Sequence, residues 1–557
     1  MDLNDEIYKS IKDLELIDQS KLDEAADLAK KHNQPLSKVL LEQDLIDDEN
    51  LGKVTADILK LPFISFKRAT ISIDALKTIP EPIARKNRVL PFVINDKQIK
   101  IAVSNKDNLE LVNNIAKKIS LELVTYFATD REIENGLTLY DQDLQKTFDE
   151  ILTKISGSEA EKKQTDAPII SLVDLLIERA SRAKASDIHV EPAKSNSKVR
   201  FRIDGVLADV VTISKPIHEQ IVSRIKVLAR LRTDEHFSAQ DGKLKANLSD
   251  EDLDVRVSIV PTTEGEGVVM RLLSSKSRQF GLSDLGMSEK DLQKVTNGYN
   301  KPYGMVLSTG PTGSGKTTTM YSILKIINTR ARNIDTIEDP VEYEILGVNH
   351  IQVNPKTNLT FAEGLRSILR QDPDIIFVGE IRDRETAGIA VNAAMTGHLV
   401  LSTLHTNDAA TSLPRLIDMD IEPFVVSSSI NVIVAQRLVR KICEHCKVSQ
   451  VISKGDLSSH LLASSVTKLV LSGEEVRVYK GKGCDVCQHT GYIGRLGIFE
   501  VLEISDPLKE LINRKADANE IKNQAIKEGM TSMLDDGLNK VKQGLTSLEE
   551  VLRSVKE

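Results

Sequence analysis

The sequence predicts a multidomain α/β protein whose central domain is a parallel sheet with a glycine-rich loop at its edge. Two observations predict this fold. First, the run Met305–Thr309 has the pattern of a buried strand and leads into Gly310–Thr317, which has the G-x-x-x-x-G-K-[ST] spacing of a phosphate-binding loop. Further apolar or β-branched runs alternate with helical patterns, as parallel strands buried on both faces require; the runs are Met305–Thr309, Asn333–Ile337, Ile375–Val378 and Leu399–Ser402.

The 557 residues leave room for three or four domains at about 150 residues each. Near the N-terminus Leu16-Ile17-Asp18 recurs as Leu45-Ile46-Asp47, and each aspartate is placed to cap an apolar helix. A polar stretch without periodicity around Ser156–Thr165 predicts a linker. We expect a helix-rich and α/β docking region (1–152), the linker (153–167), an α/β domain with an antiparallel sheet (168–280), the nucleotide-binding domain (281–440), a cysteine-bearing subdomain (441–505) and a C-terminal helical region (506–557).

Composition excludes several classes of protein. Apolar residues make up 40% and charged residues 28%, which is ordinary for a soluble globular chain. No run approaches about 18 apolar residues, and the acidic N-terminus lacks an apolar signal core, so we expect neither a membrane span nor secretion. A net charge of -8, 4% aromatic residues and no Trp argue against a nucleic-acid-binding surface.

The phosphate-binding loop predicts an ATP or GTP site, because it lies between a strand and a helix. Its glycines let backbone N–H groups approach phosphate oxygens at a helix N-terminus. Lys316 would reach the β- and γ-phosphates, and the Thr317 hydroxyl would bind Mg²⁺. The expected nucleotide-binding residues of the loop are Gly310, Pro311, Thr312, Gly313, Ser314, Gly315, Lys316, Thr317 and Thr318.

Carboxylates for the magnesium ion are expected at two strand ends. The run Ile375–Val378 leads into Gly379-Glu380 and not into an aspartate. The run Asn333–Ile337 leads into Glu338-Asp339-Pro340-Val341-Glu342. Since parallel strands end at one ligand-binding edge, these acids should converge on the metal and the γ-phosphate. A solvated acidic turn is the alternative for the second cluster.

Two pairs of arginines are candidates for phosphate contacts. If residues 255–272 form a hairpin with its tip at Thr263-Glu264, Arg256 and Arg271 lie directly opposite, and a compensating anion is expected between them. Arg366 and Arg370 are spaced i,i+4 before Asp372-Pro373, so on a helix they would share a face. Solvated or ion-paired surface positions are the alternative for both pairs.

The four cysteines predict a structural zinc site. They form two Cys-x-x-Cys pairs, separated by 37 residues, and none is left over; they are Cys443, Cys446, Cys484 and Cys487. Four thiolates with no open position suit tetrahedral Zn²⁺. A redox role would require one such pair near a thioredoxin-like fold, which the sequence does not indicate.

With these motifs in place, the chain resembles the type II secretion and type IV pilus assembly ATPases (GspE/PilB group), strongly over 168–557 and more loosely before. The stretches that carry the resemblance are Ser186–Pro192, Val199–Gly205, the phosphate-binding loop, Thr336–Glu342, Leu369–Asp374, Gly379–Asp383 and Thr396–Asn407. The resemblance implies a RecA-like ATPase core preceded by a PAS-like α/β domain, and a zinc-binding subdomain. It also implies ATP, Mg²⁺ and Zn²⁺ as cofactors.

The resemblance assigns roles position by position. It makes Glu342 the base that orients the attacking water and Glu380 its support near Mg²⁺. It places His398 and His405 near the nucleotide, although a purely structural role for two histidines flanking a buried strand is equally compatible with the sequence. It makes Arg256 and Arg271 clamps that reach the phosphates from the second domain, with Arg366 and Arg370 also near the active site.

The function implied by the resemblance is a cytoplasmic homohexameric ATPase at the inner face of the cytoplasmic membrane, acting on a membrane platform protein. Length and the N-terminal region favour pilus extension over type II secretion, which stays the alternative. A nucleic-acid-dependent hexameric ATPase and a nucleotide-gated scaffold are competing classes. Some relatives bind cyclic di-GMP through an Arg-Leu-Gly element; Gln34-Pro35-Leu36-Ser37 lacks Arg and Gly, so we do not expect that ligand.

Overall fold

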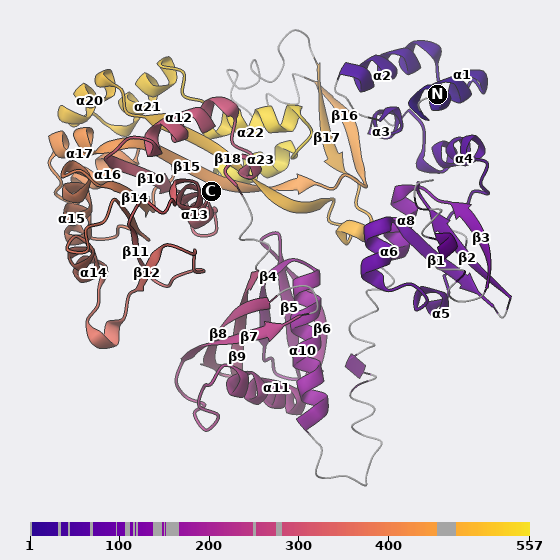
Figure 1. The fold of residues 1–557 in the computed structure, drawn as a ribbon, viewed down its shortest axis with the longest axis horizontal. Helices are drawn as coiled ribbons and strands as arrows, with labels where there is room; N and C mark the ends of the chain where they lie inside the picture. Colours follow the sequence, from indigo (N-terminus) through magenta and orange to yellow (C-terminus); the bar gives the residue numbers. More distant parts are fainter. Residues whose placement is uncertain are drawn as a thin grey trace.

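The computed structural model places three groups of elements side by side: an N-terminal region, a second domain, and an ATPase core with a cysteine-bearing extension (Figure 1). The predicted α/β fold with a parallel sheet is confirmed. None of the helices among the described residues is long and apolar enough to cross a membrane. The structure describes residues 3–31, 35–42, 45–66, 69, 71–95, 97–105, 108, 112–114, 117, 121–137, 148–149, 151, 166–248, 252–274, 281–453 and 475–556.

The N-terminal region consists of a helical unit and a small α/β unit with separate apolar cores. The Asp47 side chain accepts the Asn50 N–H and caps the fourth helix, as the repeat predicts. In the α/β unit, β1 and β2 are antiparallel, whereas β2 and β3 are parallel. The bounds are α1 Leu3–Asp13, α2 Gln19–Lys31, α3 Leu36–Glu42, α4 Asp48–Leu59, α5 Ile73–Leu76, α6 Glu81–Asn87, β1 Val89–Ile94, β2 Gln98–Val103, β3 Glu122–Phe127 and α8 Asp130–Leu137.

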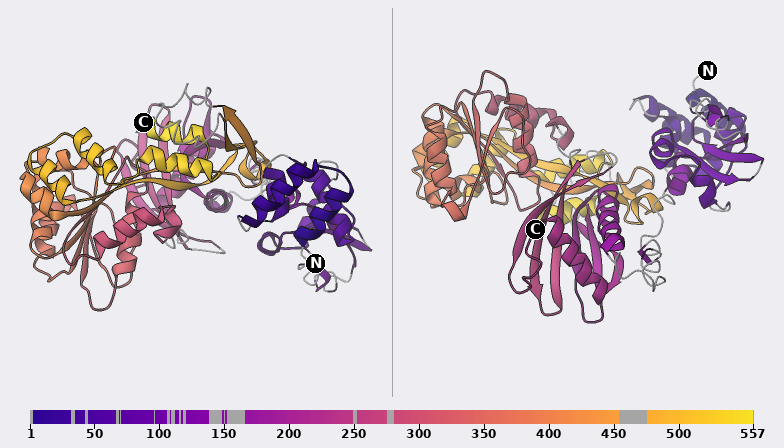
Figure 2. Two further views of the ribbon diagram at one scale, coloured as in Figure 1. Left: turned by 90° about the horizontal axis from the view of Figure 1, so that it is seen from above. Right: turned by 60° about the horizontal axis from the view of Figure 1, so that its bottom comes forward.

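The second domain is an antiparallel sheet flanked by helices, as the sequence predicts (Figure 2). Its strand order is β6-β5-β4-β9-β8-β7, with α10 and α11 contributing to the same core. Of the predicted linker 153–167, only the last two residues are described, and they begin α10. The bounds are α10 Asp166–Arg182, β4 Ala185–Glu191, β5 Asn196–Ile203, β6 Val206–Ser214, α11 Lys215–Leu228, β7 Gln240–Asn247, β8 Asp252–Thr262 and β9 Gly265–Ser274.

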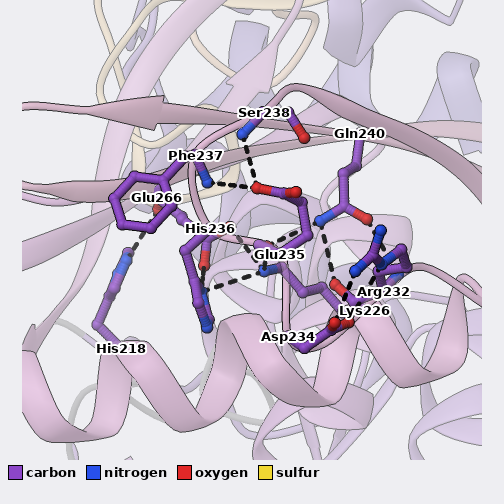
Figure 3. Close-up of polar contacts among 10 residues, drawn as sticks. All are labelled: His218, Lys226, Arg232, Asp234, Glu235, His236, Phe237, Ser238, Gln240 and Glu266. Atoms are coloured by element: carbon purple, nitrogen blue, oxygen red, sulfur yellow. Dashed lines mark hydrogen bonds and ion pairs between the residues drawn. The ribbon is translucent and has the colours of Figure 1, made fainter.

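A buried ion pair fixes the loop between α11 and β7 (Figure 3). The Lys226 ammonium is 1% exposed and lies 2.7 Å from a carboxylate oxygen of Glu266. It also donates to the Glu235 carbonyl at 2.6 Å, while His236 contacts the second Glu266 oxygen at 2.9 Å. The loop therefore has a set conformation, in which the Phe237 ring is 91% exposed.

The ATPase core is a seven-stranded sheet in the order β12-β11-β13-β14-β10-β15-β18, with only β18 antiparallel to its neighbour. Its central strands are fully buried, which explains their continuous apolar runs. The bounds are η4 Ser283–Leu285, α12 Glu289–Tyr299, β10 Gly304–Thr309, α13 Lys316–Ile327, β11 Ile334–Glu338, β12 Asn349–Gln352, η5 Pro355–Thr357, α14 Phe361–Ile368, β13 Ile375–Val378, α15 Arg384–Met395, β14 Leu399–Leu404, α16 Ser412–Asp418 and α17 Pro423–Ser429.

The cysteine-bearing extension shares its strands with the ATPase sheet. Strand β15 (Ile430–Ile442) crosses the boundary expected at residue 440, and β18 (Tyr492–Glu503) pairs with it over most of its length. The antiparallel strands β16 and β17 lie beyond the ends of β15 and β18 that carry the cysteines, so the extension projects from that end of the sheet (Figure 1). The remaining bounds are β16 Lys447–Ser453, β17 Glu475–Gly481, η6 Asp485–Cys487, α20 Asp506–Asn513, α21 Ala518–Lys527, α22 Met533–Lys542 and α23 Leu548–Lys556.

Candidate nucleotide and metal sites

The phosphate-binding loop joins the end of β10 to the start of α13, at the edge where β11, β13 and β14 also end. Gly313 and Gly315 have φ values of +78° and +90°, which residues with a Cβ rarely adopt. The Lys316 ammonium donates to the carbonyls of Gly310 and Pro311 at 2.8 and 3.0 Å. All the predicted loop residues thus lie together around the N-terminus of α13, where its unpaired N–H groups favour an anion.

Glu380 lies close to this loop. Burial lowers the pKa of Lys316, and the negative charge of Glu380 acts in the opposite direction. The Glu380 side chain is 10% exposed and accepts hydrogen bonds from Arg382 at 2.6 Å and His405 at 3.2 Å. The structure therefore brings a carboxylate and a histidine from two neighbouring strand ends to the edge that carries the loop.

Glu338 is held inside the core. Its oxygens accept from the Tyr321 hydroxyl at 2.5 Å, the Thr336 hydroxyl at 2.7 Å and His350 Nδ1 at 2.9 Å. His350 Nε2 accepts the Ile345 N–H, so Nδ1 carries the proton that it donates to Glu338. Both carboxylate oxygens of Glu338 already have protein donors. Its expected contact with the nucleotide or Mg²⁺ would require these bonds to be shared.

Glu342 lies at the contact between the ATPase core and the second domain. One of its oxygens is 3.0 Å from the Arg256 guanidinium, which also donates to the Val341 carbonyl at 2.6 Å. Its backbone N–H donates to the Tyr321 hydroxyl at 3.3 Å. Burial and the Glu338 charge raise the pKa of Tyr321, so this hydroxyl stays protonated; it donates to the Glu338 carboxylate and accepts the Glu342 backbone N–H.

The arginine pair of the second domain has the predicted register. Thr262 pairs with Gly265 at the hairpin tip, and Arg256 pairs directly with Arg271. The compensating anions are two carboxylates of the chain itself: Glu342 next to Arg256, and Asp187 at 3.0 Å from Arg271. Arg256 thus reaches the expected catalytic acid, whereas Arg271 is 59% exposed and bound within its own sheet.

Arg366 and Arg370 are placed differently from the expectation of one continuous helix. Helix α14 ends at Ile368, because the N–H groups of Arg370 and Gln371 bond three residues back and tighten the chain into a turn before Asp372-Pro373. Arg366 forms ion pairs with Glu363 at 2.7 Å and Glu385 at 2.5 Å. Arg370 donates to the Arg366 carbonyl at 2.8 Å. In this structure both side chains are bound on the surface of the core.

The two histidines lie at opposite ends of β14. His405 follows its last residue and contacts Glu380, whereas His398 precedes its first residue and contacts the Ala393 carbonyl at 3.0 Å. Six residues at about 3.3 Å each separate the ends by about 20 Å. The structure therefore brings His405, and not His398, to the edge of the sheet that carries the loop.

The four cysteines form one cluster at the junction of β15, β16, β17 and β18. The Sγ–Sγ distances are 3.8 Å for Cys443–Cys484 and Cys446–Cys487, and 3.7 Å for Cys484–Cys487. A tetrahedral zinc ion with Zn–S bonds of about 2.3 Å separates its sulfurs by about 3.8 Å, so the cluster fits Zn²⁺. Backbone N–H groups of Gly483 and Gly491 donate to two of the sulfurs, which stabilises thiolates.

Residues that sequence reasoning missed complete the nucleotide edge. Tyr321 and His350 orient the acidic box, and Thr406 bonds the Thr309 hydroxyl at 2.6 Å next to the loop. The sequence signal was weak, because their partners come from distant elements. A tyrosine within the apolar face of Lys316–Ile327, the helix after the loop, was the one visible sign.

The comparisons with known proteins agree with this geometry. Residues 162–553 match the family model described as Type II/IV secretion system protein, and residues 59–146 match the MshEN domain model. The type IV pilus assembly ATPase PilB of Myxococcus xanthus is 38% identical over 552 residues, which cover 96% of each chain. The type II secretion system ATPase E of Vibrio cholerae is 46% identical over 396 residues, 71% of this chain and 77% of that one.

The X-ray structure of the Legionella pneumophila ATPase DotB has a TM-score of 0.50 and 20% identity, and covers 68% of this chain and 94% of its own. At that identity it supports the fold alone. The family model spans most of the chain, and the loop, the acid at the end of β13 and the cysteine cluster are all assembled. The chain therefore belongs to the family of type II/IV secretion and pilus assembly ATPases, which hydrolyse ATP.

Proposed function

We propose that this chain is the extension ATPase of a type IV pilus. One observation carries the choice: the similarity to the Myxococcus pilus ATPase extends over 96% of both chains, N-terminal region included. The pilus ATPase PilB of Pseudomonas aeruginosa is likewise matched over its whole length, at 35% identity. The type II secretion ATPases are more similar where they match, but they cover 71% of this chain.

The proposed assembly is a homohexamer in the cytoplasm, bound to a membrane platform protein. ATP would bind with its phosphates at the loop, and Mg²⁺ would be held by the Thr317 hydroxyl with carboxylate support from Glu380. When bound, the metal would neutralise charge on the phosphates. Zn²⁺ would hold the cysteine extension together and take no part in hydrolysis.

In this proposal Glu342 orients the attacking water, and Arg256 holds the Glu342 carboxylate from the second domain. The distance of 3.0 Å between their side chains supports that assignment. His405 donates to Glu380 and fixes the orientation of that acid, at 3.2 Å. The hydrogen bonds and ion pairs of four other candidates are made to residues outside the loop; these are His398, Arg366, Arg370 and Arg271. A role for them at the nucleotide requires another arrangement of domains or a neighbouring subunit.

The choice between pilus and secretion functions is tested in the organism that carries this gene. A strain lacking the gene is complemented with the wild-type chain or with Glu342→Gln, and pili sheared from the cells and proteins exported to the medium are quantified. We expect the strain lacking the gene, and the same strain complemented with Glu342→Gln, to lose pili and to keep protein export. Loss of export with normal piliation would establish the secretion alternative instead. Normal function with Glu342→Gln would instead favour a nucleotide-gated scaffold.

The nucleic-acid-dependent alternative is tested on the purified protein. Phosphate release is measured with and without duplex and single-stranded DNA at 50 and at 200 mM salt, chosen as roughly the range over which phosphate contacts weaken. We expect no stimulation. Strong stimulation that disappears at the higher salt concentration would support a nucleic-acid motor.

The N-terminal region is proposed as the docking module for the platform protein. MshEN domains are related to cyclic di-GMP binding, so the match of residues 59–146 weighs against the expectation drawn from Gln34–Ser37. The matched range begins after those four residues. Titration calorimetry of the full chain with cyclic di-GMP decides the question: saturable heat would overturn the expectation drawn from Gln34–Ser37, and the absence of heat would support it.

A further inference from the structure

One buried amide on strand β15 contacts the three elements that shape the phosphate-binding loop. Gln436 is 2% exposed. Its Nε2 donates to the Ser314 carbonyl at 2.8 Å, within the loop itself. Its Oε1 accepts from Thr319 on α13 at 2.7 Å and from Ser308 on β10 at 3.3 Å. The strand before the loop, the loop and the helix after it are thus bonded to a single side chain.

The chemistry of these partners fixes which end of the amide faces the loop. A backbone carbonyl can only accept a hydrogen bond, so the Ser314 carbonyl requires the amide nitrogen. The hydroxyls of Thr319 and Ser308 can then both donate to the amide oxygen. A carboxylate would lose the donor, and an apolar side chain would leave a buried carbonyl and hydroxyls unpaired.

Anchoring the Ser314 carbonyl also sets the direction of the next N–H group. The C=O of Ser314 and the N–H of Gly315 belong to one planar trans peptide, and in such a peptide the two bonds point in opposite directions. The Gly315 N–H therefore points away from the Gln436 amide. Gly315 also precedes the first residue of α13, where free N–H groups and the helix dipole favour anions.

The glycines of the loop fit closely against the same residue. A Cβ built on Gly310 would lie 2.4 Å from the Gln436 carbonyl oxygen, and one on Gly315 would lie 3.0 Å from its Nε2. Both glycines have positive φ, at 146° and 90°. The loop backbone can therefore approach strand β15 this closely only at residues that have no side chain.

We propose that Gln436 is a positioning residue for the nucleotide: through the Ser314 carbonyl it holds the Gly315 N–H in the direction that phosphate binding requires. The inference rests on the proposed nucleotide site at Gly310–Thr317 and names a residue that sets its affinity. A misdirected donor would weaken binding of the phosphates in the ground state and the transition state alike. The dissociation constant and KM should then rise together, with little change in kcat.

The test compares Gln436→Met with wild type in the zinc-loaded full chain. Affinity is measured by fluorescence titration with the N-methylanthraniloyl derivative of ADP, and KM and kcat by phosphate release from ATP. We expect about a 10-fold rise in both the dissociation constant and KM, the effect of roughly one lost charged hydrogen bond, with kcat changed by less than about threefold. Gln436→Glu, which lacks the donor, should bind no better than the Met variant.

Asn431 provides a matched control on the same strand. It is also a buried amide, 7% exposed, and donates to the carbonyls of Gly298 at 3.2 Å and Tyr303 at 2.9 Å, away from the loop. Asn431→Leu should lower the melting temperature as much as Gln436→Met and leave nucleotide affinity unchanged. Equal loss of affinity in both variants would show general destabilisation and overturn the proposal.

Further outcomes separate this inference from the nucleotide site on which it rests. Wild-type affinity in Gln436→Met or in Gln436→Glu would refute the role of the amide while leaving the site intact. If wild type itself does not bind the ADP derivative, or if Lys316→Ala binds it equally well, the proposed site fails and the inference fails with it.

Discussion

Replacing Glu550 by Gln tests how the C-terminal helix α23 is held against β15. The Glu550 side chain is 3% exposed, and its oxygens accept from the Arg440 guanidinium at 2.6 Å and from Arg553 at 2.9 Å. Burial alone would raise the pKa of this carboxyl, but the hydrogen bonds from Arg440 and Arg553 outweigh burial and lower its pKa to about 2. The ionised form is therefore the one that the fold stabilises.

The size of the effect follows from that shift. A fall of about 2.5 units from the ordinary value of 4.5 corresponds to about 3 kcal/mol at 1.36 kcal/mol per unit. Because the folded pKa is depressed, this contribution is present above pH 4.5 and is lost as the pH falls from about 4.5 toward 2. At neutral pH, Glu550→Gln replaces the ionised carboxylate by a neutral amide, so the variant should lose most of this stabilising free energy.

The assay is hydrogen exchange of the α23 and β15 amides, since a multidomain chain does not unfold in one step. A loss of about 3 kcal/mol would speed exchange through local opening roughly 100-fold. Glu520→Gln is the control, because Glu520 also bonds an arginine, Arg514, at 2.6 Å, but both side chains are more than half exposed. That variant should change exchange of α21 less than about fivefold. A similarly small effect of Glu550→Gln would refute the argument that the buried pairing stabilises the helix.

Three further changes have defined outcomes. Cys446→Ser removes one of four clustered thiols and should abolish stoichiometric zinc, measured by release to a chromogenic chelator; retained zinc would mean that another ligand set holds it. Arg256→Gln removes the cation 3.0 Å from Glu342 and should lower ATP turnover at least about 10-fold in a phosphate-release assay, whereas unchanged turnover would remove Arg256 from the site. Lys226→Met leaves the Glu266 carboxylate without its lysine cation and should destabilise the second domain by about 3–5 kcal/mol, measured by hydrogen exchange of the α11 amides; a loss below about 1 kcal/mol would contradict the pairing.

The parts of the site that could be predicted are those fixed by local geometry. The spacing Gly310–Thr317 dictates a loop at a helix N-terminus, and the two cysteine pairs predict four thiols close together. The pairing of Arg256 with Arg271 followed from the hairpin alone, because a tip at Thr263-Glu264 leaves a single register for the strands. None of these required knowledge of how distant segments pack.

The remaining features depend on partners far apart in the sequence. Glu338 could be assigned to a strand end, but its bonds to Tyr321 and His350 depend on how α13 and β12 pack beside β11. Gln436 could not be predicted from local pattern, because its bonds cross more than 100 residues. The end of α14 before Arg370 was missed because the sequence pattern extends past the tightened last turn.

The packing also shows which parts of the chain can move relative to one another. The cysteine extension shares β15 and β18 with the ATPase sheet, so it must move with that sheet. The second domain has its own apolar core, and its contacts with the rest include polar ones, such as Arg256 to Glu342 and the Asp204 carboxylate to the Gly494 N–H at 2.7 Å. Polar interfaces of this kind open at little cost, because water can replace their hydrogen bonds. One of these polar contacts involves the acid expected to orient the attacking water, so separation of the two domains would free Glu342 from Arg256 and alter the chemical site in the same motion.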